Sequence, residues 1–103
     1  MREVRLRQRA QLDLESLDIY IAYESAMPKA AESTLEALYG AFERLADLPE
    51  SGMLFASDDL DREYRRTLVK NYWVYYTYDD DALTVWRIFH VRQDIDTCTV
   101  VDL

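Results

Sequence analysis

The side chains most able to do chemistry lie between residues 63 and 92: Arg65, Arg66, Arg87 and His90. A guanidinium is always charged and offers several N–H donors, so it suits anion binding. An unperturbed imidazole titrates near neutrality, which would allow His90 to act as a general acid or base. Together these groups suit anion binding, or proton transfer beside a negatively charged transition state.

Each of these residues also has a structural interpretation. Arg87 stands among apolar neighbours and could pair with a helix acid such as Asp13 or Glu24. A lone histidine at the end of a strand, such as His90, is more often structural than catalytic. The tyrosines are expected to pack the two faces of a sheet, and the tryptophans to anchor a core or an interface: Tyr72, Tyr75, Tyr76 and Tyr78, with Trp73 and Trp86.

The elements that position these residues are three predicted strands. Tyr64–Lys70 is followed by a tight turn at Lys70-Asn71 and by Tyr72–Tyr78, whose aromatic and β-branched residues favour a pleated surface. Ala82–His90 is apolar on both faces, which indicates a strand covered on each side. The connections are too short for a parallel crossover, so these strands pair antiparallel. Asp79–Asp81 is expected to be a solvated turn, not a metal site, because three adjacent acids cannot all face one ion.

The first half of the chain predicts a short strand and two helices. Val4 and Leu6 alternate with arginines, which is typical of an edge strand. Helical spacing follows from Gln8, and a second helix follows Met27-Pro28 and ends at residues 48–52. The apolar stripes of the two helices are Ala10, Leu14, Leu17 and Ile21, and Ala31, Leu35, Leu38, Phe42 and Leu45.

The predicted fold class is α+β, in the order β-α-α-β-β-β, with a helical hairpin packed on a small antiparallel sheet. Met53–Arg62 is expected to be a polar, acidic loop, and the residues after Arg92 could add a short last strand. We expect the 103 residues to form a single domain, residues 1–103, because this length suffices for one core.

Composition and charge narrow the function classes. No apolar run approaches the roughly 20 residues that cross a bilayer, and no signal peptide is readable, so we expect a cytoplasmic protein. Cys98 is the only cysteine, which excludes an internal disulfide and leaves no metal-type cysteine spacing; we expect neither a metal nor a cofactor. A net charge of −8 disfavours direct binding to DNA or RNA, although a local basic patch could bind an acidic partner.

The chain resembles the ParE branch of the RelE/ParE toxins of bacterial toxin–antitoxin modules. The resemblance covers almost the whole sequence. Its motifs are Ala10, Asp13 and Leu14; residues 45–52 (LADLPESG); Tyr64-Arg65-Arg66; Asn71-Tyr72; Tyr75-Tyr76; and, most specifically, residues 87–94 (RIFHVRQD). It implies a cytoplasmic protein of a bacterium or archaeon with a ParD-like antitoxin encoded beside it. Members of the ParE branch are reported to poison DNA gyrase, and members of the RelE branch to cut mRNA on the ribosome.

A RelE-like ribonuclease would use Arg65 or Arg66, Arg87 and His90 as its catalytic set. That set is small, because acids at residues 57–61 (SDDLD) stand where the RelE branch has lysines. Acids there would repel substrate phosphates, and the net charge disfavours docking on RNA. Gyrase poisoning without catalytic residues is therefore the leading prediction.

A binding protein needs exposed apolar surface instead of a catalytic set. The first helix carries a second apolar stripe beside the main one, formed by Leu12, Ile19, Tyr20 and Tyr23. This stripe is more apolar than a solvent-facing surface should be, unless it packs only within the domain. We expect the antitoxin to contact Leu12, Ile19, Tyr20, Tyr23, Arg65 and Arg87. A third possibility is an inactive toxin that acts only as a subunit of the antitoxin complex.

Overall fold

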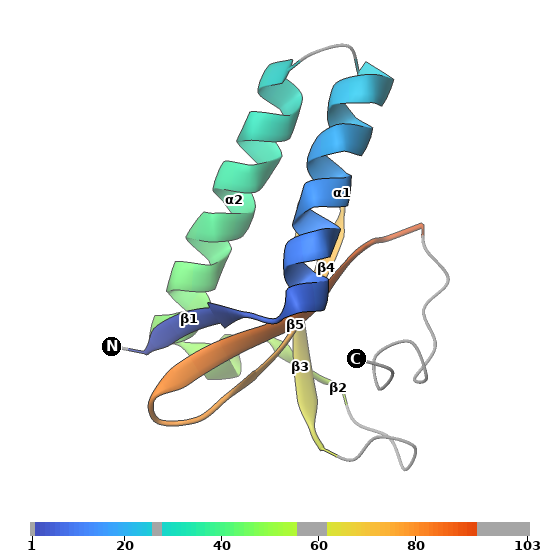
Figure 1. Ribbon diagram of the computed structural model, residues 1–103. Coiled ribbons are helices and arrows are strands. Elements are labelled where there is room, and N and C mark those ends of the chain that lie inside the picture. The colour runs from blue at the N-terminus through green and yellow to red at the C-terminus, as the bar shows by residue number, and fades with distance from the viewer. Residues whose placement is uncertain (1, 26–27, 56–61, 93–103) are drawn as a thin grey trace.

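The α+β class and the helical hairpin packed on a sheet are confirmed by the structure, a computed structural model that describes residues 2–25, 28–55 and 62–92 (Figure 1). Of residues 18–25, 28, 30 and 31 it describes the backbone only. The elements in order are β1 (Glu3–Leu6), α1 (Gln8–Ser25), α2 (Pro28–Asp47), the short 3-10 helix η1 (Pro49–Ser51), β2 (Met53–Phe55), β3 (Tyr64–Val69), β4 (Tyr72–Tyr78) and β5 (Ala82–His90).

The sheet has the strand order β1-β5-β4-β3-β2, which confirms β1 as an edge strand. However, β1 runs parallel to β5, with Glu3 opposite Ala82 and Leu6 opposite Val85. The sheet is therefore mixed, and the prediction of a purely antiparallel sheet was wrong. Short hairpins fix the antiparallel pairs β3–β4 and β4–β5, whereas β1 reaches β5 through most of the chain, so no short turn fixes its direction.

The prediction that all of Met53–Arg62 forms a loop was also wrong. The first three residues of this segment form β2, which pairs antiparallel with β3 at the other edge of the sheet. A strand of three residues is too short to show the alternation by which strands are recognised. The rest of that loop, except Arg62, and the predicted last strand after Arg92 lie outside the described residues.

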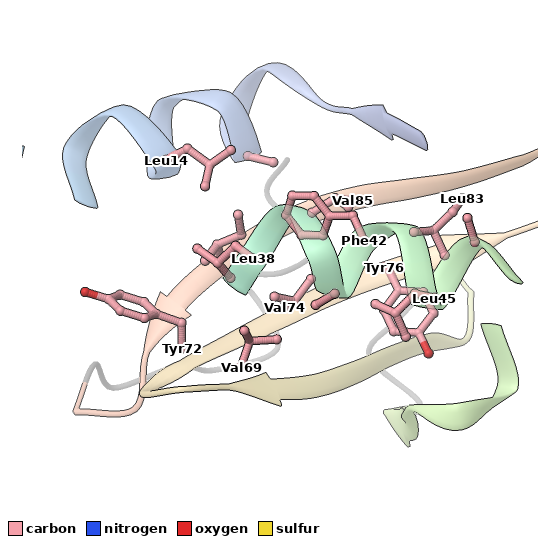
Figure 2. Packing of buried hydrophobic residues seen from close by; sticks show 14 of the residues in the cluster. Leu14, Leu38, Phe42, Leu45, Val69, Tyr72, Val74, Tyr76, Leu83 and Val85 are labelled. Carbon is pink, nitrogen blue, oxygen red and sulfur yellow. The ribbon is translucent and has the colours of Figure 1, made fainter. Parts of the chain in front are cut away.

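The main core lies between the helices and one face of the sheet (Figure 2). Alternate residues of β4 point toward the helices, because side chains alternate between the faces of a strand. Strand β5 follows the same rule on each side of the register shift at Trp86. The predicted stripes are buried wherever their side chains are described, apart from the partly buried Leu35. The core includes Ala10, Leu14 and Leu17 of α1, Leu38, Phe42 and Leu45 of α2, and Tyr72, Val74, Tyr76, Leu83, Val85 and Ile88 of the sheet.

The opposite side of the sheet, here called the outer face, carries a second cluster made mostly of rings. Its buried members are Tyr64, Tyr75, Trp86 and Phe89, with Phe55 and Trp73 packed against them. The rings of Tyr64 and Trp86 meet edge to face, with centroids 5.5 Å apart. Strand β5 is thus buried on both faces, as its apolar sequence predicted.

The turn after α2 is pinned to the sheet by one tyrosine. The Tyr76 hydroxyl donates to the Pro49 carbonyl at 2.6 Å and accepts from the Gly52 N–H at 3.1 Å. A Cβ on Gly52 would lie 2.2 Å from that hydroxyl oxygen, so position 52 requires glycine for steric reasons. Residues Pro49–Gly52 are therefore held against β4, directly before β2 begins at Met53. Burial raises the pKa of Tyr76 above its ordinary 10.0, and the Gly52 N–H and the Arg65 charge partly offset this rise.

Side-chain and backbone geometry also close the two hairpins. Lys70 takes a left-handed conformation, with φ of 53°, at the predicted Lys70-Asn71 turn. At the second turn the Asp79 carboxylate accepts the backbone N–H groups of Asp81 and Ala82, each at 2.8 Å. These two hydrogen bonds, to Ala82 and then to Asp81, lower the pKa of Asp79. The acidic cluster is an exposed turn held by its first member.

Candidate functional site

Two of the candidate arginines lie in one row across the sheet. Arg66 of β3 is opposite Tyr75 of β4, and Tyr75 is opposite Arg87 of β5. Two strand spacings separate the arginine backbones, which amounts to about 10 Å. The row lies on the outer face, because Tyr75 belongs to the outer cluster.

Arg87 is held by the carboxylate of Asp13. Its Nε donates to Asp13 Oδ2 at 2.8 Å and its Nη2 to Oδ1 at 3.1 Å, a bidentate pair whose side chains are only 14% and 17% exposed. Asp13 Oδ2 also accepts the backbone N–H of Ile88 at 2.9 Å. Strand β1 pairs with β5 only as far as Val85. Beyond that point Asp13 takes the place of a strand neighbour and accepts the backbone N–H of Ile88. Of the two partners predicted for Arg87, the structure selects Asp13.

Arg66 is held by rings. The centre of its guanidinium lies 4.3 Å from the ring centroid of Trp73 and 5.3 Å from that of Phe55. Its Nη1 donates to the Tyr75 hydroxyl at 3.2 Å. Its Nε is buried and has no hydrogen-bond acceptor within residues 2–25, 28–55 and 62–92.

The Arg65 side chain stabilises the turn after α2 through hydrogen bonds to its backbone. Its Nη1 donates to the carbonyl of Gly52 at 2.9 Å and, more weakly, to that of Glu50 at 3.4 Å. Arg65 lies opposite Tyr76 in the β3–β4 pair, so both side chains hold the same turn. This geometry favours a structural role for Arg65 over partner contact.

His90 lies on the helix-facing side of the sheet, away from Arg66. Its ring meets that of Tyr72 edge to face at 5.2 Å, and its Nδ1 accepts the backbone N–H of Arg92 at 3.1 Å. A neutral His90 therefore carries its proton on Nε2. The imidazole borders a pocket of about 380 Å³ between α1 and the end of β5, lined by Asp13, Ser16, Leu17, Tyr72, Ile88, His90 and Arg92.

The predicted ribonuclease set is therefore not assembled. Arg66 faces outward between two rings, the charge of Arg87 is neutralised by Asp13, and His90 lies behind the sheet. A cleavage site needs an acid, a base and charge stabilisation within hydrogen-bond reach of one phosphate. In the part of the chain that the structure describes, no group of three metal-ligating side chains occurs either.

Of the residues predicted to contact the antitoxin, Leu12 is 47% exposed, beside Arg7, Gln8 and Arg9. Arg65 and Arg87 have the internal partners given above. Of Ile19, Tyr20 and Tyr23 the structure describes only the backbone.

Sequence reasoning missed two cations of the outer face. The guanidinium of Arg7 lies 4.2 Å from the ring centroid of Trp86, and that of Arg62 lies 4.9 Å from it. Arg7 directly follows the first strand, in the alternating arginine pattern of residues 2–9, so its position at a sheet edge was readable. The contact with a tryptophan far along the sequence was not.

Comparison with known proteins decides the family. The model of the ParE toxin of the type II toxin–antitoxin system, parDE, matches residues 4–95. The chain belongs to this family. A similar solved structure, a chain of the chromosomal ParDE toxin–antitoxin system from P. aeruginosa, has a TM-score of 0.70 and 13% sequence identity. The match covers 87% of this chain and 96% of that one, which supports the fold.

No curated protein matches this ParE-family sequence. Among the residues that the structure describes, no helix is long and apolar enough to cross a membrane.

Proposed function

We propose that this ParE-family toxin poisons DNA gyrase in the cytoplasm by binding it, and that a ParD-like antitoxin neutralises it. One observation carries the choice of mechanism: the three candidate catalytic residues do not converge on one site. A binding protein tolerates that arrangement, whereas an acid–base catalyst does not.

The internal partners of the basic residues support the same choice. Arg87 is held by Asp13, and Arg65 by backbone carbonyls of its own chain. Releasing either one to bind a substrate phosphate would leave a buried or partly buried group unsatisfied. The net charge of −8 would also oppose docking on ribosomal RNA.

The test is a gyrase assay with the purified, antitoxin-free protein. Gyrase and relaxed plasmid are incubated with increasing toxin, and both supercoiling and trapped cleaved DNA are scored. The proposal expects dose-dependent loss of supercoiling together with trapped cleavage complexes. Plasmid with toxin but no gyrase is the control, and cleavage in that control would identify a nuclease.

The alternative is a ribosome-dependent ribonuclease, which the alignment of Arg66, Tyr75 and Arg87 in one row leaves open for testing. Translating ribosomes are incubated with the wild-type protein and with His90→Gln. Codon-specific mRNA cleavage that this variant abolishes would replace the gyrase proposal. A protein that is inert in both assays yet binds an antitoxin would be an inactive subunit of the complex.

A further inference from the structure

The outer face carries a group of aromatic rings with arginine guanidiniums lying over them. We call Arg7, Arg66, Phe55, Trp73 and Trp86 the arginine–aromatic cluster. Both arginines lie over rings of the cluster. Arg5 pairs with Glu3 and Arg87 with Asp13, whereas no carboxylate among the described residues pairs with Arg7 or Arg66.

One N–H donor of the Arg66 side chain, at Nε, lacks a hydrogen-bond acceptor among the described residues. This nitrogen is also shielded from solvent. A buried donor without an acceptor is rare in folded proteins, because it loses its water without gaining a partner. An acceptor supplied by another molecule would restore the lost hydrogen bond.

The neighbouring arginine shows which acceptor fits. In the same row of the sheet, Arg87 holds the Asp13 carboxylate through Nε and Nη2. Arg66 uses Nη1 for the Tyr75 hydroxyl, which leaves its own Nε–Nη2 edge without an acid. A carboxylate matches that edge, because two parallel N–H groups meet its two oxygens.

The surroundings favour a peptide over a nucleic acid. Met53 and Leu68, 58% and 51% exposed, flank the row on the same face, since they pair with Arg66 and Trp73. Apolar side chains beside a cation suit a peptide that carries both apolar and acidic residues. The net charge of −8 repels a continuous phosphate backbone but much less a pair of carboxylates.

We propose that the arginine–aromatic cluster binds an acidic, extended segment of the antitoxin, with one carboxylate on Arg66 and a second on Arg7. The apolar residues of that segment lie on Met53 and Leu68, and one ring beside Arg66 turns aside to admit the first carboxylate. The inference rests on the proposed function, because the antitoxin is the partner that supplies the segment. It extends the predicted contact at Leu12, since Arg7 borders Leu12 as well as Trp86.

The test uses peptides and does not involve gyrase. A random library of twelve-residue peptides is selected against the wild-type protein. The best peptide and its analogue, with every Asp and Glu changed to the amide, are then titrated. Binding is followed by tryptophan fluorescence, which reports this face alone because Trp73 and Trp86 are the only two tryptophans in the sequence.

The proposal expects enriched peptides to carry at least two acids, and the amide analogue to bind at least tenfold more weakly. Arg66→Gln should weaken the acidic peptide at least tenfold, and Arg66→Lys should recover only part, because lysine cannot form the bidentate pair. Arg5→Gln, at an exposed arginine paired with Glu3, is the matched control and should bind normally. Circular dichroism confirms that each variant is folded.

Three results would overturn the proposal: no acidic sequence is enriched, the amide analogue binds equally well, or Arg66→Gln binds like the wild type. A twelve-nucleotide single-stranded RNA that binds more tightly than any peptide, and that loses binding in Arg66→Gln, would assign the cluster to nucleic acid instead. Failure of the gyrase assay would leave these outcomes unchanged, so the two proposals fail separately.

Discussion

Replacing Asp13 tests whether Arg87 is a structural residue. Asp13→Ala would leave the guanidinium of Arg87 without its acid and the Ile88 N–H without its acceptor. Breaking a buried pair costs about 3–5 kcal/mol, and the low end applies here because both side chains are slightly exposed. The orphaned N–H adds about 1 kcal/mol, so the expected loss is about 4 kcal/mol.

Because a domain of this size has only about 5–15 kcal/mol of stability, Asp13→Asn is the safer variant. The amide oxygen can still accept from Ile88, while the charge is lost, and we expect a loss of about 2 kcal/mol. Urea unfolding followed by tryptophan fluorescence measures both values, provided the slopes agree. Glu3→Gln, which breaks the exposed Arg5–Glu3 pair, is the control and should cost less than about 0.5 kcal/mol.

One pattern of results would refute this reasoning. If Asp13→Asn is no less stable than Glu3→Gln, the Arg87–Asp13 pair does not hold the fold together. If Arg87→Gln then stays equally stable but loses gyrase inhibition, Arg87 contacts the target. The assignment of Arg87 to packing would be wrong.

Three further predictions concern the turn after α2 and the second hairpin. Gly52→Ala places a Cβ 2.2 Å from the Tyr76 oxygen and should cost about 1–3 kcal/mol in urea unfolding. Tyr76→Phe orphans the Pro49 carbonyl and the Gly52 N–H at a cost of about 2 kcal/mol. Because burial raises the pKa of Tyr76, its contribution is full below its ordinary pKa of 10.0 and is lost as pH rises through the folded value. Stability measured from about pH 9 to pH 11 should therefore fall less steeply in Tyr76→Phe than in the wild type. The pKa of Asp79 is lowered, so its contribution to stability is present above its ordinary pKa of 3.8 and is lost as pH falls through the folded value. The stability of Asp79→Ala should therefore decrease less at acid pH than that of the wild type. An equally steep decrease in the two proteins would contradict this.

The sequence predicted the elements whose periodicity is long and regular. Strand β4 was predicted with its observed ends, and β5 was recognised as buried on both faces because apolar residues continue without alternation. The stripe of α2 was readable for the same reason. Arg87 was correctly given an acid of the first helix as one possible partner, because an arginine among apolar residues needs one.

The rest depended on contacts between distant segments. β2 is a strand only because β3 lies beside it, and three residues carry no periodic signal. The parallel direction of β1 follows from the path of the whole chain. The register of β4 and β5 shifts between Tyr75 and Tyr76, and such an irregularity leaves no mark in residue types. The sequence also could not show that Arg66 lies beside the rings of Phe55 and Trp73, which are on the two neighbouring strands. The buried Nε–H of Arg66 without an acceptor among the described residues was equally unpredictable.

The most direct test of the central claim is the amount of gyrase–DNA cleavage complex trapped by the wild-type protein and by His90→Gln. We expect both proteins to trap cleaved DNA equally, because gyrase poisoning by binding requires no chemistry from His90. The claim would be contradicted if the wild-type protein trapped none, or if a folded His90→Gln protein lost the activity.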